Sequence, residues 1–433
     1  MTVLIAGGGV AGCTSAIGLR RLGYDVLLIT RPRPFAAYEG LSQRSFDALN
    51  TLGCIQAAAT VFPPSARFSV WNGEAKQANH EYLIYRPDFD RALLEDVRRN
   101  GVGIIEGSVI GTLGGLASRP SCRIKTSEGF RTIDADAAID ARGRFVPARD
   151  AYVSGPPSVS ILQKLTLPPF LEPATSLHSI RRGWIWQAAL PNGAGYLQLT
   201  TDAKTAGAIR NFATLRRHMG HCDEAWIVEG SNENGKPLLR DATSRLHKKI
   251  VAQRVFYAGD AASAVDPLSG NGIFQTLAMT SVLPFVIHTV LNRDEADGAN
   301  AIAFYRERVR DLFRRYTSTG RDFYRAETRY ADEPFWSDRN VWQPTLPTVS
   351  SVRIERRSVI IAPYVESKSV VITPSHPNGV RFFEGIDLVP IVEQLLQYPP
   401  DGREENFSGQ CRNLEPMLRA KLFLWLKENT ILS

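Results

Sequence analysis

Residues 2–30, TVLIAGGGVAGCTSAIGLRRLGYDVLLIT, decide the fold of the first part of the chain. A short apolar run at 2–6 leads into the glycines of 7–12, the spacing of 13–22 is helical, and 24–30 is a second apolar run. A strand, a glycine turn, a helix and a strand in this order form the βαβ unit that binds dinucleotides. A glycine turn that binds nothing is the alternative, and the strand–turn–helix context disfavours it.

Each glycine of the GxGxxG pattern has its own physical role. Gly7 permits the tight turn, Gly9 lets the main chain approach a pyrophosphate, and Gly12 lets the helix pack closely on the strand. The N-terminus of the helix that follows offers unpaired N–H groups and a partial positive charge to phosphates, and Ala11 lies in the turn before it. We therefore expect these four residues to bind the cofactor.

The second strand departs from the dinucleotide-binding pattern at its end. An acidic residue usually stands there and hydrogen-bonds the adenosine ribose, but this strand ends in Thr30 and Arg31. Thr30 offers a hydroxyl group, and Arg31 could reach a phosphate or stack on adenine. Both residues are cofactor-binding candidates, while the acidic ribose contact is missing from its usual place.

The composition is that of a globular protein with two or three domains. The chain has 433 residues, of which 44% are hydrophobic and 22% are charged, which excludes disorder, collagen and coiled coil. The 51 Lys and Arg residues exceed the 44 Asp and Glu residues, for a net charge of +7. This charge is compatible with an anionic partner and does not require one.

The cysteines and histidines predict neither disulfides nor a metal site. The five cysteines are scattered and form no CxxC pair, so a reducing compartment, the cytoplasm, is expected. His218, His221 and Cys222 stand close together, but no second cluster lies near in sequence to complete a tetrahedral site. We therefore expect no metal.

Two stretches resemble targeting or membrane segments without meeting their requirements. The N-terminal MTVLIAGGGVAGC has no basic residue before its apolar run, and glycines interrupt it, so it does not match a lipoprotein signal. The apolar stretch 273–291 contains Gln275, Pro284 and His288, which favours a buried helix over a membrane span. We expect no membrane partner.

Three further segments carry the cofactor signal. They are DARGR at 140–144, GDAA at 259–262 directly after a strand, and DPLSGNG at 266–272, which opens a helix. On these residues the chain resembles the class A flavoprotein monooxygenases. The resemblance implies FAD, with Asp260 on its ribityl chain. It also implies a helix N-terminus aimed at the N1–C2=O edge of the flavin, where reduced flavin is negative. The loop residues concerned are Pro267, Gly270, Asn271 and Gly272.

The resemblance and the strand patterns together predict an α/β plus antiparallel β fold. Short strands with turn signals, such as WIWQAAL at 184–190 and YLQLT at 196–200, indicate an antiparallel sheet, and VFYAG at 255–259 returns to a buried-strand pattern. The first domain is therefore discontinuous. We expect a Rossmann-like FAD-binding domain at 1–153 and 227–342, an inserted substrate sheet at 154–226 and a small C-terminal α+β module at 343–433.

Residues 298–331 form an expected helix with two interpretations. Seven arginines lie between 306 and 325, and aromatic residues recur between them, mostly three or four positions apart. This pattern could mark a surface for nucleic acid. An amphipathic helix with an aromatic core stripe and a solvated basic face is the preferred interpretation, so we expect no nucleic-acid partner.

Other motifs narrow the resemblance to one branch of flavoproteins. The matching stretches are EGLS at 39–42 with Arg44, LNTLG at 49–53, SVWNG at 69–73, RPDFDRAL at 86–93 and residues 323–339. They resemble the branch that holds the tryptophan halogenases and the quinone-cofactor maturation flavoproteins, over roughly residues 1–340. The resemblance adds Arg44 and Val109 to the FAD-binding candidates. Trp184, Trp186 and Gln43 are candidates for the substrate pocket.

Halogenation and oxygenation are the two activities known in this branch. Halogenases resemble one another in a WxWxIP motif and an active-site lysine, but here Trp184 and Trp186 begin a longer WIWQAALP. Lys76 lies in NGEAKQ, which does not match and suits an exposed hairpin. Oxygenation at the flavin C4a atom is favoured, and most of that chemistry belongs to the cofactor. A nucleophilic indole substrate needs no general base, so no catalytic residue is assigned.

The additional residues 343–433 favour a protein substrate, which a docking surface would serve. Here the chain resembles the flavoprotein monooxygenase family that matures quinohemoprotein amine dehydrogenase. This implies hydroxylation of a tryptophan in a small protein like the γ subunit, already cross-linked by a radical enzyme, towards tryptophylquinone. O2 would be the co-substrate, with NAD(P)H or a separate reductase as the electron source. A halogenase or small-aromatic hydroxylase, and a non-enzymatic nucleic-acid-binding protein, remain as alternatives.

Overall fold

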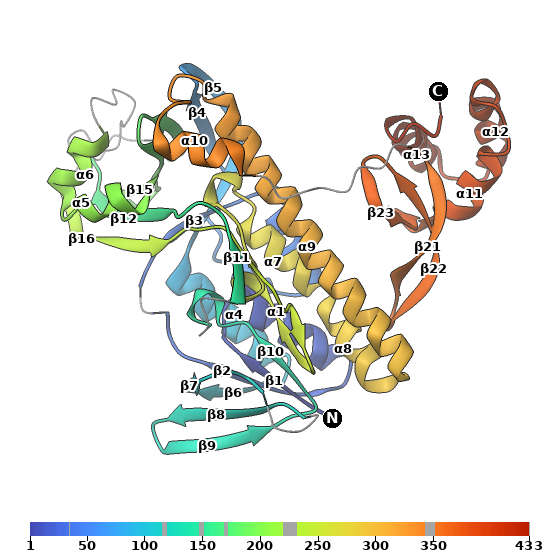
Figure 1. The fold of residues 1–433 in the computed structure, drawn as a ribbon, viewed down its shortest axis with the longest axis horizontal. Coiled ribbons are helices and arrows are strands. Elements are labelled where there is room, and N and C mark those ends of the chain that lie inside the picture. The colour runs from blue at the N-terminus through green and yellow to red at the C-terminus, as the bar shows by residue number, and fades with distance from the viewer. Residues whose placement is uncertain are drawn as a thin grey trace. The chain divides into compact units, whose positions relative to one another are not determined.

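The computed structural model describes residues 1–33, 35–114, 119–146, 151–168, 172–219, 232–342 and 351–432 (Figure 1). The chain divides into two compact units. The first comprises Met1–Pro284 and Arg306–Pro344, and the second comprises Phe285–Tyr305 and Thr345–Ser433.

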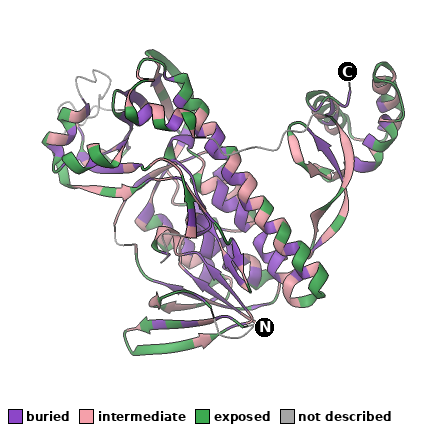
Figure 2. Ribbon diagram, in the orientation of Figure 1, coloured by how far each residue is buried: buried purple, intermediate pink, exposed green. Residues whose placement is uncertain are grey.

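A six-stranded sheet, in the order β18-β19-β10-β1-β2-β6, forms the base of the first unit. Its central strands are parallel, with β18 antiparallel at one edge, and helix α1 connects β1 to β2 as the glycine pattern predicted. Val3, Leu4 and Ile5 are completely buried between the layers (Figure 2). The strands are β1 (Thr2–Ala6), β2 (Asp25–Thr30), β6 (Gly103–Glu106), β10 (Ala137–Asp140), β18 (Val251–Ala252) and β19 (Val255–Tyr257).

Helices and two small sheets complete this layer. The helices are α1 (Val10–Arg21), α2 (Gln43–Leu52), α3 (Ile55–Ala58), α4 (Arg86–Arg99) and α7 (Gly272–Thr280), with 3-10 turns at η1 (Gly143–Phe145), η3 (Gly259–Ala261) and η4 (Pro267–Ser269). One small sheet has β7 (Ser108–Ile110), β8 (Ser121–Thr126) and β9 (Gly129–Asp134), and the other has β11 (Tyr152–Ser154), β17 (Arg245–His247) and β20 (Ser263–Ala264). Helix α1 begins three residues before the predicted 13–22, because the last glycines of the turn already belong to its first turn.

An eight-stranded sheet, in the order β16-β12-β15-β14-β13-β4-β5-β3, stands beside the nucleotide-binding layer (Figure 1). It is wider than the predicted segment 154–226. Strand β13 pairs in parallel with β4, from a distant part of the chain, and strand patterns do not reveal partners that are distant in sequence. The strands are β3 (Tyr38–Leu41), β4 (Ser65–Trp71), β5 (Glu74–Tyr85), β12 (Val159–Thr166), β13 (Ala174–Ile180), β14 (Gly183–Ala189), β15 (Ala194–Thr201) and β16 (Asn232–Asp241).

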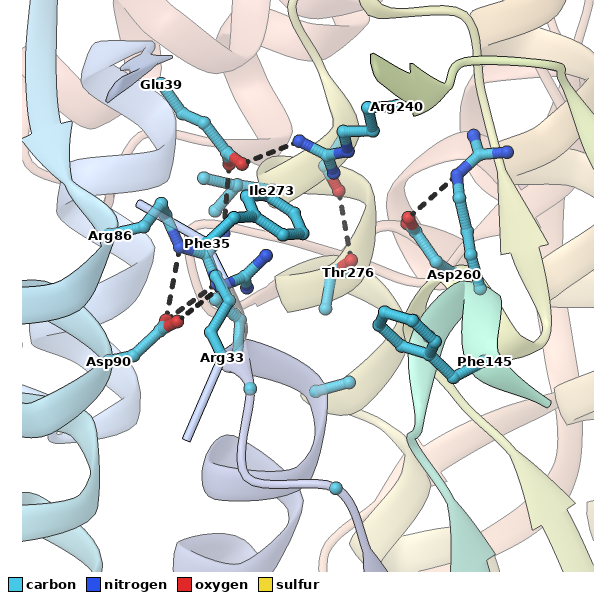
Figure 3. A pocket seen from close by; sticks show the side chains of 18 of the residues that line it. Arg33, Phe35, Glu39, Arg86, Asp90, Phe145, Arg240, Asp260, Ile273 and Thr276 are labelled. Atoms are coloured by element: carbon cyan, nitrogen blue, oxygen red, sulfur yellow. Dashed lines mark hydrogen bonds and ion pairs between the residues drawn. The ribbon is translucent and has the colours of Figure 1, made fainter. Parts of the chain in front are cut away.

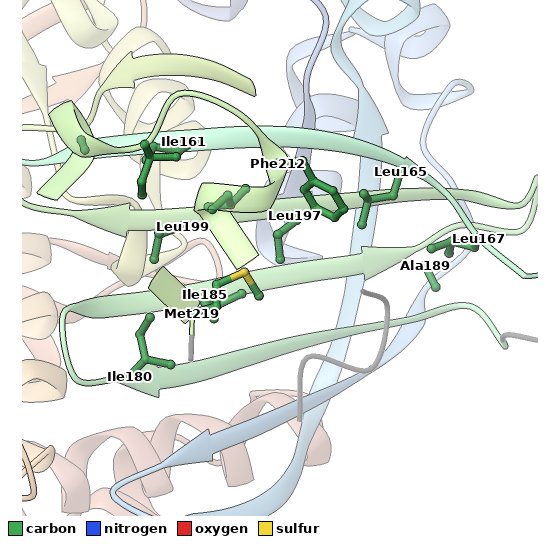
Figure 4. Packing of buried hydrophobic residues seen from close by; sticks show 13 residues of the cluster. Ile161, Leu165, Leu167, Ile180, Ile185, Ala189, Leu197, Leu199, Phe212 and Met219 are labelled. Atoms are coloured by element: carbon green, nitrogen blue, oxygen red, sulfur yellow. The ribbon is translucent and has the colours of Figure 1, made fainter. Parts of the chain in front are cut away.

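The two faces of this sheet have different neighbours. Ile185 and Leu197 point to one face and pack with Phe212 and Met219, because helices α5 (Ala203–Ala208) and α6 (Phe212–Met219) cover it (Figure 4). Side chains alternate along a strand, so Trp184 points to the opposite face. That face packs against the first unit's aromatic core.

The motifs at 69–73 and 323–339, which are shared with the halogenase branch, are hydrogen-bonded to each other; we call this contact the latch. Trp71 Nε1–H donates to the carbonyl O of Phe323 at 2.9 Å, and Asn72 N–H donates to the Glu327 carboxylate at 2.8 Å. Glu327 is completely buried and is also held by Arg329. The latch joins the β4–β5 turn to the end of helix α9 (Glu295–Ala326), ahead of α10 (Pro334–Val341).

Most of the predicted aromatic stripe of helix α9 is buried, although Phe323 is 46% exposed. Phe313, Tyr316 and Tyr324 are each at most 6% exposed, while the arginines lie on less buried positions. One apolar stretch, Gly272–Asn292, is long enough to cross a membrane by length and composition. It consists of two helices, α7 and α8 (Leu283–Asn292), and 56% of its most apolar window is buried, as in a core helix.

The second unit has its own core of buried residues, including Val371, Leu388 and Leu422. Its strands are β21 (Arg353–Ile361), β22 (Tyr364–Thr373), β23 (His376–Val380), β24 (Phe382–Phe383) and β25 (Ile386–Asp387), and its helices are α11 (Leu388–Leu395), α12 (Arg403–Gln410) and α13 (Pro416–Glu428), with a 3-10 turn at η5 (Pro400–Gly402).

The second unit also contains residues 285–305, which the sequence placed in the FAD-binding domain. The Thr289 hydroxyl of α8 accepts a hydrogen bond from the N–H of Val365 in β22 at 2.9 Å. The Arg293 guanidinium lies 4.0 Å from the ring centre of Tyr364. The sequence of an apolar helix does not specify which neighbour the helix packs against. The assignment of residues 285–305 to the second unit could therefore not be predicted from the sequence.

Candidate active site

A cavity of about 1660 Å³ in the first unit unites most of the predicted site residues. Its volume exceeds the usual range for one drug-sized ligand. Ten arginines and six carboxylates line it, and this excess of four positive charges suits an anionic ligand. The arginines are 31, 33, 67, 86, 91, 98, 142, 144, 240 and 245, and the acidic residues are Glu39, Glu81, Asp90, Glu106, Asp241 and Asp260.

The glycine turn forms one end of the cavity. Gly7 has φ +112°, and a Cβ atom there would lie 2.4 Å from the carbonyl O of Ala141. A Cβ on Gly12 would lie 1.8 Å from the carbonyl O of Gly7, whereas a Cβ on Gly9 would meet nothing within 4 Å. No side chain caps helix α1 at Gly9, and its first turn has no acidic residue. The free N–H groups of this turn therefore face an open space that suits phosphate.

An acidic residue lies beside the end of β2, although the end of β2 itself contains none. Thr30 pairs in register with Glu106, the last residue of β6, and both line the cavity together with Arg31. A ribose-binding carboxylate is thus available from the next strand. Sequence reasoning missed Glu106 because it searched the end of β2. Arg31 lies over the Phe145 ring, 5.9 Å from its centre, and Phe145 is 60% exposed and lines the cavity, so a free aromatic face is available.

Asp260 lies beside the glycine turn, as the GD motif predicts. Gly259 has φ +60°, and a Cβ there would lie 2.8 Å from the Cβ of Ala11, so the two turns touch. The Asp260 carboxylate is 3.5 Å from Arg144 Nε (Figure 3). Arg144 also contacts Asp241 at 3.0 Å. The carboxylate is one-third exposed, towards the cavity that it lines.

The loop at 266–272 adopts the geometry of a helix entry. Asp266 accepts a hydrogen bond from the N–H of Leu268, Gly270 has φ +62°, and helix α7 begins at Gly272. Pro267, Gly270 and Gly272 line the cavity. Asn271 does not, because its Nδ2 donates to the carbonyl O of Ser269.

Some predicted residues lie outside the cavity lining. Gly12 lies behind it in the helix–strand contact. Arg44 is exposed and stacks on Phe274, 4.8 Å from its ring centre. Gln43 is also exposed, where it accepts a hydrogen bond from Tyr82 and donates to Asp47, so it is not part of the substrate pocket. Val109, on β7, does line the cavity.

Trp184 and Trp186 line the other end of the cavity, together with Leu268 of the 266–272 loop. Trp184 Nε1–H donates to the hydroxyl of Tyr324 at 3.0 Å, and the Tyr324 hydroxyl donates to Asp266 at 3.0 Å. Burial raises the pKa of Asp266 and of Tyr324, and the Asp266 charge raises that of Tyr324 further. Sequence reasoning missed this relay because Tyr324 is far from both partners in sequence.

The change Tyr324→Phe is expected to lower the free energy of unfolding by about 1–3 kcal/mol. It removes the hydroxyl that satisfies both Trp184 and the buried Asp266. Urea unfolding followed by fluorescence measures the change. Tyr330→Phe is the matched control, since no described residue forms a recorded hydrogen bond with its hydroxyl. Equal effects of the two changes would contradict the relay.

Ion pairs fix the wall between the two ends of the cavity. Glu39 of β3 accepts from Arg86 at 2.9 Å and from Arg240 at 3.0 Å, and Asp90 accepts from Arg86 at 2.7 Å and from Arg33 at 2.8 Å (Figure 3). Burial raises the pKa of Glu39, but the charges of the arginines outweigh it and hold the pKa well below its usual range. The network ties β3, β16, α4 and the segment after β2 together.

Two further predictions concern residues away from the cavity. Lys76 of β5 is exposed and does not line the cavity, as expected of a hairpin residue. Among the described residues, no group of three or more His, Cys, Asp or Glu side chains could hold a metal ion. His221 and Cys222 lie outside the described residues.

A mainly parallel nucleotide-binding sheet and a mainly antiparallel sheet that share one basic, partly aromatic cavity are typical of the flavin-dependent monooxygenases and halogenases. Residues 36–358 match the family described as tryptophan halogenase. The chain therefore belongs to the tryptophan halogenase family. It is an enzyme with FAD as its cofactor, and this assignment excludes the non-enzymatic alternative.

Individual relatives cover almost the whole chain. The tryptophan 2-halogenase of Chondromyces crocatus is 23% identical over 441 residues, which cover 94% of this chain and 82% of the relative. The solved peptidyl tryptophan dihydroxylase QhpG, essential for tryptophylquinone cofactor biogenesis, is 33% identical and has a TM-score of 0.78, with 99% of this chain and 98% of that chain covered. The flavin-dependent halogenase CmlS has a TM-score of 0.77 at 18% identity, with 99% and 95% covered.

The cavity fits FAD in shape and charge. The open, uncapped start of α1 suits the diphosphate, and Glu106 with Thr30 suits the adenosine ribose. Asp260 offers a carboxylate at the cavity wall that suits the hydroxyl groups of a ribityl chain, and the N-terminus of α7 suits the electron-rich edge of the flavin ring. The aromatic end beyond the 266–272 loop then remains for a substrate.

Proposed function

We propose that this protein is an FAD-dependent monooxygenase that hydroxylates the indole of a tryptophan in a small protein, towards a tryptophylquinone cofactor. The relative that is 33% identical over 99% of this chain is a peptidyl tryptophan dihydroxylase. The observation that carries the proposal is that one and the same cavity is lined by Asp260 and by Trp184 and Trp186, with Lys76 outside its lining. A halogenase that used this lysine would need it in the cavity.

The residues of the chain bind and orient the substrate while the cofactor supplies the oxidising power. Bound FAD, once reduced by NAD(P)H or a separate reductase, provides an electrophilic oxygen atom from O2. Trp184, Trp186 and Tyr38 are each at most 9% exposed and form an apolar wall that excludes water from that end of the cavity. The indole is itself nucleophilic, so a proton-abstracting base is not needed to start the reaction.

We infer that the substrate resembles the γ subunit of quinohemoprotein amine dehydrogenase and arrives already cross-linked by a radical enzyme in the cytoplasm. The second unit, which has its own core, is assigned to docking this protein. Intact substrate protein should then have a lower KM than a short peptide around the same tryptophan, with a similar kcat. Equal KM values would contradict the docking role.

The test of the proposed function is hydroxylation of a tryptophan-containing substrate protein. FAD-loaded enzyme, a flavin reductase, NADH and O2 are incubated with the substrate, and mass spectrometry is expected to show the addition of one or two oxygen atoms to the tryptophan. Asp260→Ala should purify with little flavin and no activity, whereas Lys76→Ala should be fully active. Incorporation of chlorine or bromine, abolished by Lys76→Ala, would instead establish a halogenase.

A further inference from the structure

The aromatic end of the cavity contains a carboxylate that the binding of FAD does not use. Glu81, on β5, lines the cavity together with Trp186 and Arg67 and is only 8% exposed. Burying a carboxylate is costly unless hydrogen bonds or charges compensate it. Its presence beside the two tryptophans therefore requires a reason.

The partners of Glu81 leave one of its oxygen atoms available. Oε2 accepts a hydrogen bond from Trp186 Nε1–H at 3.2 Å. Oε1 lies 3.9 Å from Arg67 Nη1, which is an ion pair and too long for a hydrogen bond. A carboxylate can accept about four hydrogen bonds, and among the described residues no hydrogen-bond donor to Oε1 is recorded. Oε1 is thus an available acceptor at the cavity wall, on a side chain that is largely buried.

The neighbouring strand makes room for this oxygen atom. Gly40 of β3 pairs with Leu83 of β5, two residues from Glu81. A Cβ atom on Gly40 would lie 2.1 Å from Glu81 Oε1 and 2.7 Å from its carboxyl carbon. Gly40 therefore permits the position that the carboxylate takes beside the cavity.

We propose that Glu81 Oε1 accepts a hydrogen bond from the indole N–H of the substrate tryptophan. This rests on the proposed function. An indole N–H is a donor that would lose its bond to water in an apolar pocket unless an acceptor replaced it. Electrophilic attack on the ring also places positive charge on its nitrogen atom, and a nearby carboxylate stabilises that charge. Glu81 would thus bind the ring in the ground state and act as a catalytic residue by stabilising the transition state.

A comparison of two ligands tests the hydrogen bond without relying on turnover. The ligands are N-acetyl-tryptophanamide and its 1-methylindole counterpart, and their Kd values for oxidised, FAD-loaded enzyme are measured by equilibrium dialysis. Wild-type enzyme is expected to prefer the N–H ligand roughly 10- to 100-fold, as for a hydrogen bond to a charged group. Glu81→Leu should abolish this preference. A preference that persists in Glu81→Leu, or that is absent from the wild type, would overturn the proposal.

Further variants distinguish a direct contact between Glu81 and the substrate from a purely structural hydrogen bond between Glu81 and Trp186. Glu81→Gln keeps an acceptor for the N–H but loses the charge, so it should retain part of the ligand preference while kcat falls more than affinity. Gly40→Ala keeps the carboxylate but displaces Oε1, and it should reduce the preference. Lys76→Gln, on the exposed part of the same strand, is the control and should change neither the ligand preference nor kcat.

The outcome is independent of the test of the proposed function. Tryptophan hydroxylation by an enzyme whose Glu81→Leu variant still discriminates between the two ligands would remove the role of Glu81 and leave the function intact. Loss of discrimination in Glu81→Leu, in an enzyme that attaches a halogen, would keep the indole-binding role and remove the hydroxylase.

Discussion

The Gly12→Ala protein is expected to purify without FAD. The added Cβ would lie 1.8 Å from the carbonyl O and 3.0 Å from the carbonyl carbon of Gly7, and both are main-chain atoms that no side-chain rotation can move aside. Helix α1 must then shift from β1, and its N–H groups leave the phosphate position. A cost of about 3 kcal/mol from such overpacking corresponds to roughly 100-fold weaker binding. The flavin absorbance per mole of purified protein measures the loss.

Two other glycines make this result specific. A Cβ on Gly9 meets nothing within 4 Å, so Gly9→Ala should keep the stability of the wild type and lose FAD affinity only because the methyl group occupies the phosphate position. A Cβ on Gly320 in α9 also meets nothing within 4 Å, so Gly320→Ala should leave FAD affinity unchanged and raise the free energy of unfolding by at most about 1 kcal/mol, as for any Gly→Ala change inside a helix. A Gly12→Ala protein with the same flavin absorbance per mole as the wild type would contradict the proposed role of Gly12 in the packing of the turn.

Arg86→Ala is expected to cause the largest loss of stability, about 3–5 kcal/mol in the free energy of unfolding. Arg86 is 5% exposed and pairs with both Glu39 and Asp90, so its removal takes the most buried cation out of the network and leaves two partly buried carboxylates with Arg240 and Arg33 alone to compensate them. Urea denaturation gives the value. Arg91 lies on the same helix and forms an exposed ion pair with Asp88. Arg91→Ala should therefore change the free energy of unfolding by less than about 1 kcal/mol. Similar losses from both changes would contradict the role of burial.

Lowering the pH should remove the contribution that the ion pairs of Glu39 make to the free energy of unfolding. The folded-state pKa of Glu39 lies well below the ordinary value of 4.5 because of its arginine partners, although burial opposes them. Its contribution to stability is therefore complete above that ordinary value and is lost as pH falls through the lower folded-state value. The difference between wild type and Glu39→Gln should shrink with acidification. A difference that grows towards low pH would contradict the ion-pair assignment.

Features that depend on neighbours in sequence were predictable, and those that depend on distant partners were not. The turn at Gly7 and Gly12 and the helix entry at Gly270 follow from local backbone requirements that only particular residues satisfy. Glu81 and Tyr324 join the site because β5 and α9 reach it from distant parts of the chain. Their own sequence contexts resemble those of ordinary strand and helix residues.

Glu106 illustrates the same limit at the cofactor end. The pattern for a ribose-binding acid specifies the end of β2, and the chain places Thr30 there. The parallel register sets Glu106 beside it from β6, so the requirement is met by geometry rather than by position in the motif. The width of the eight-stranded sheet has the same cause, because the β4–β13 pairing joins segments that are distant in sequence.

The relay from Trp184 through Tyr324 to Asp266 has a thermodynamic consequence. It connects the wall that faces the substrate to the loop that opens α7 beside the flavin position. A substrate ring that displaced Trp184 would strain both hydrogen bonds and, through Tyr324 and Asp266, the loop, and the binding of the two ligands would then be coupled. Linkage is reciprocal, so whatever factor the flavin imposes on the affinity for the substrate, the substrate imposes on the affinity for the flavin.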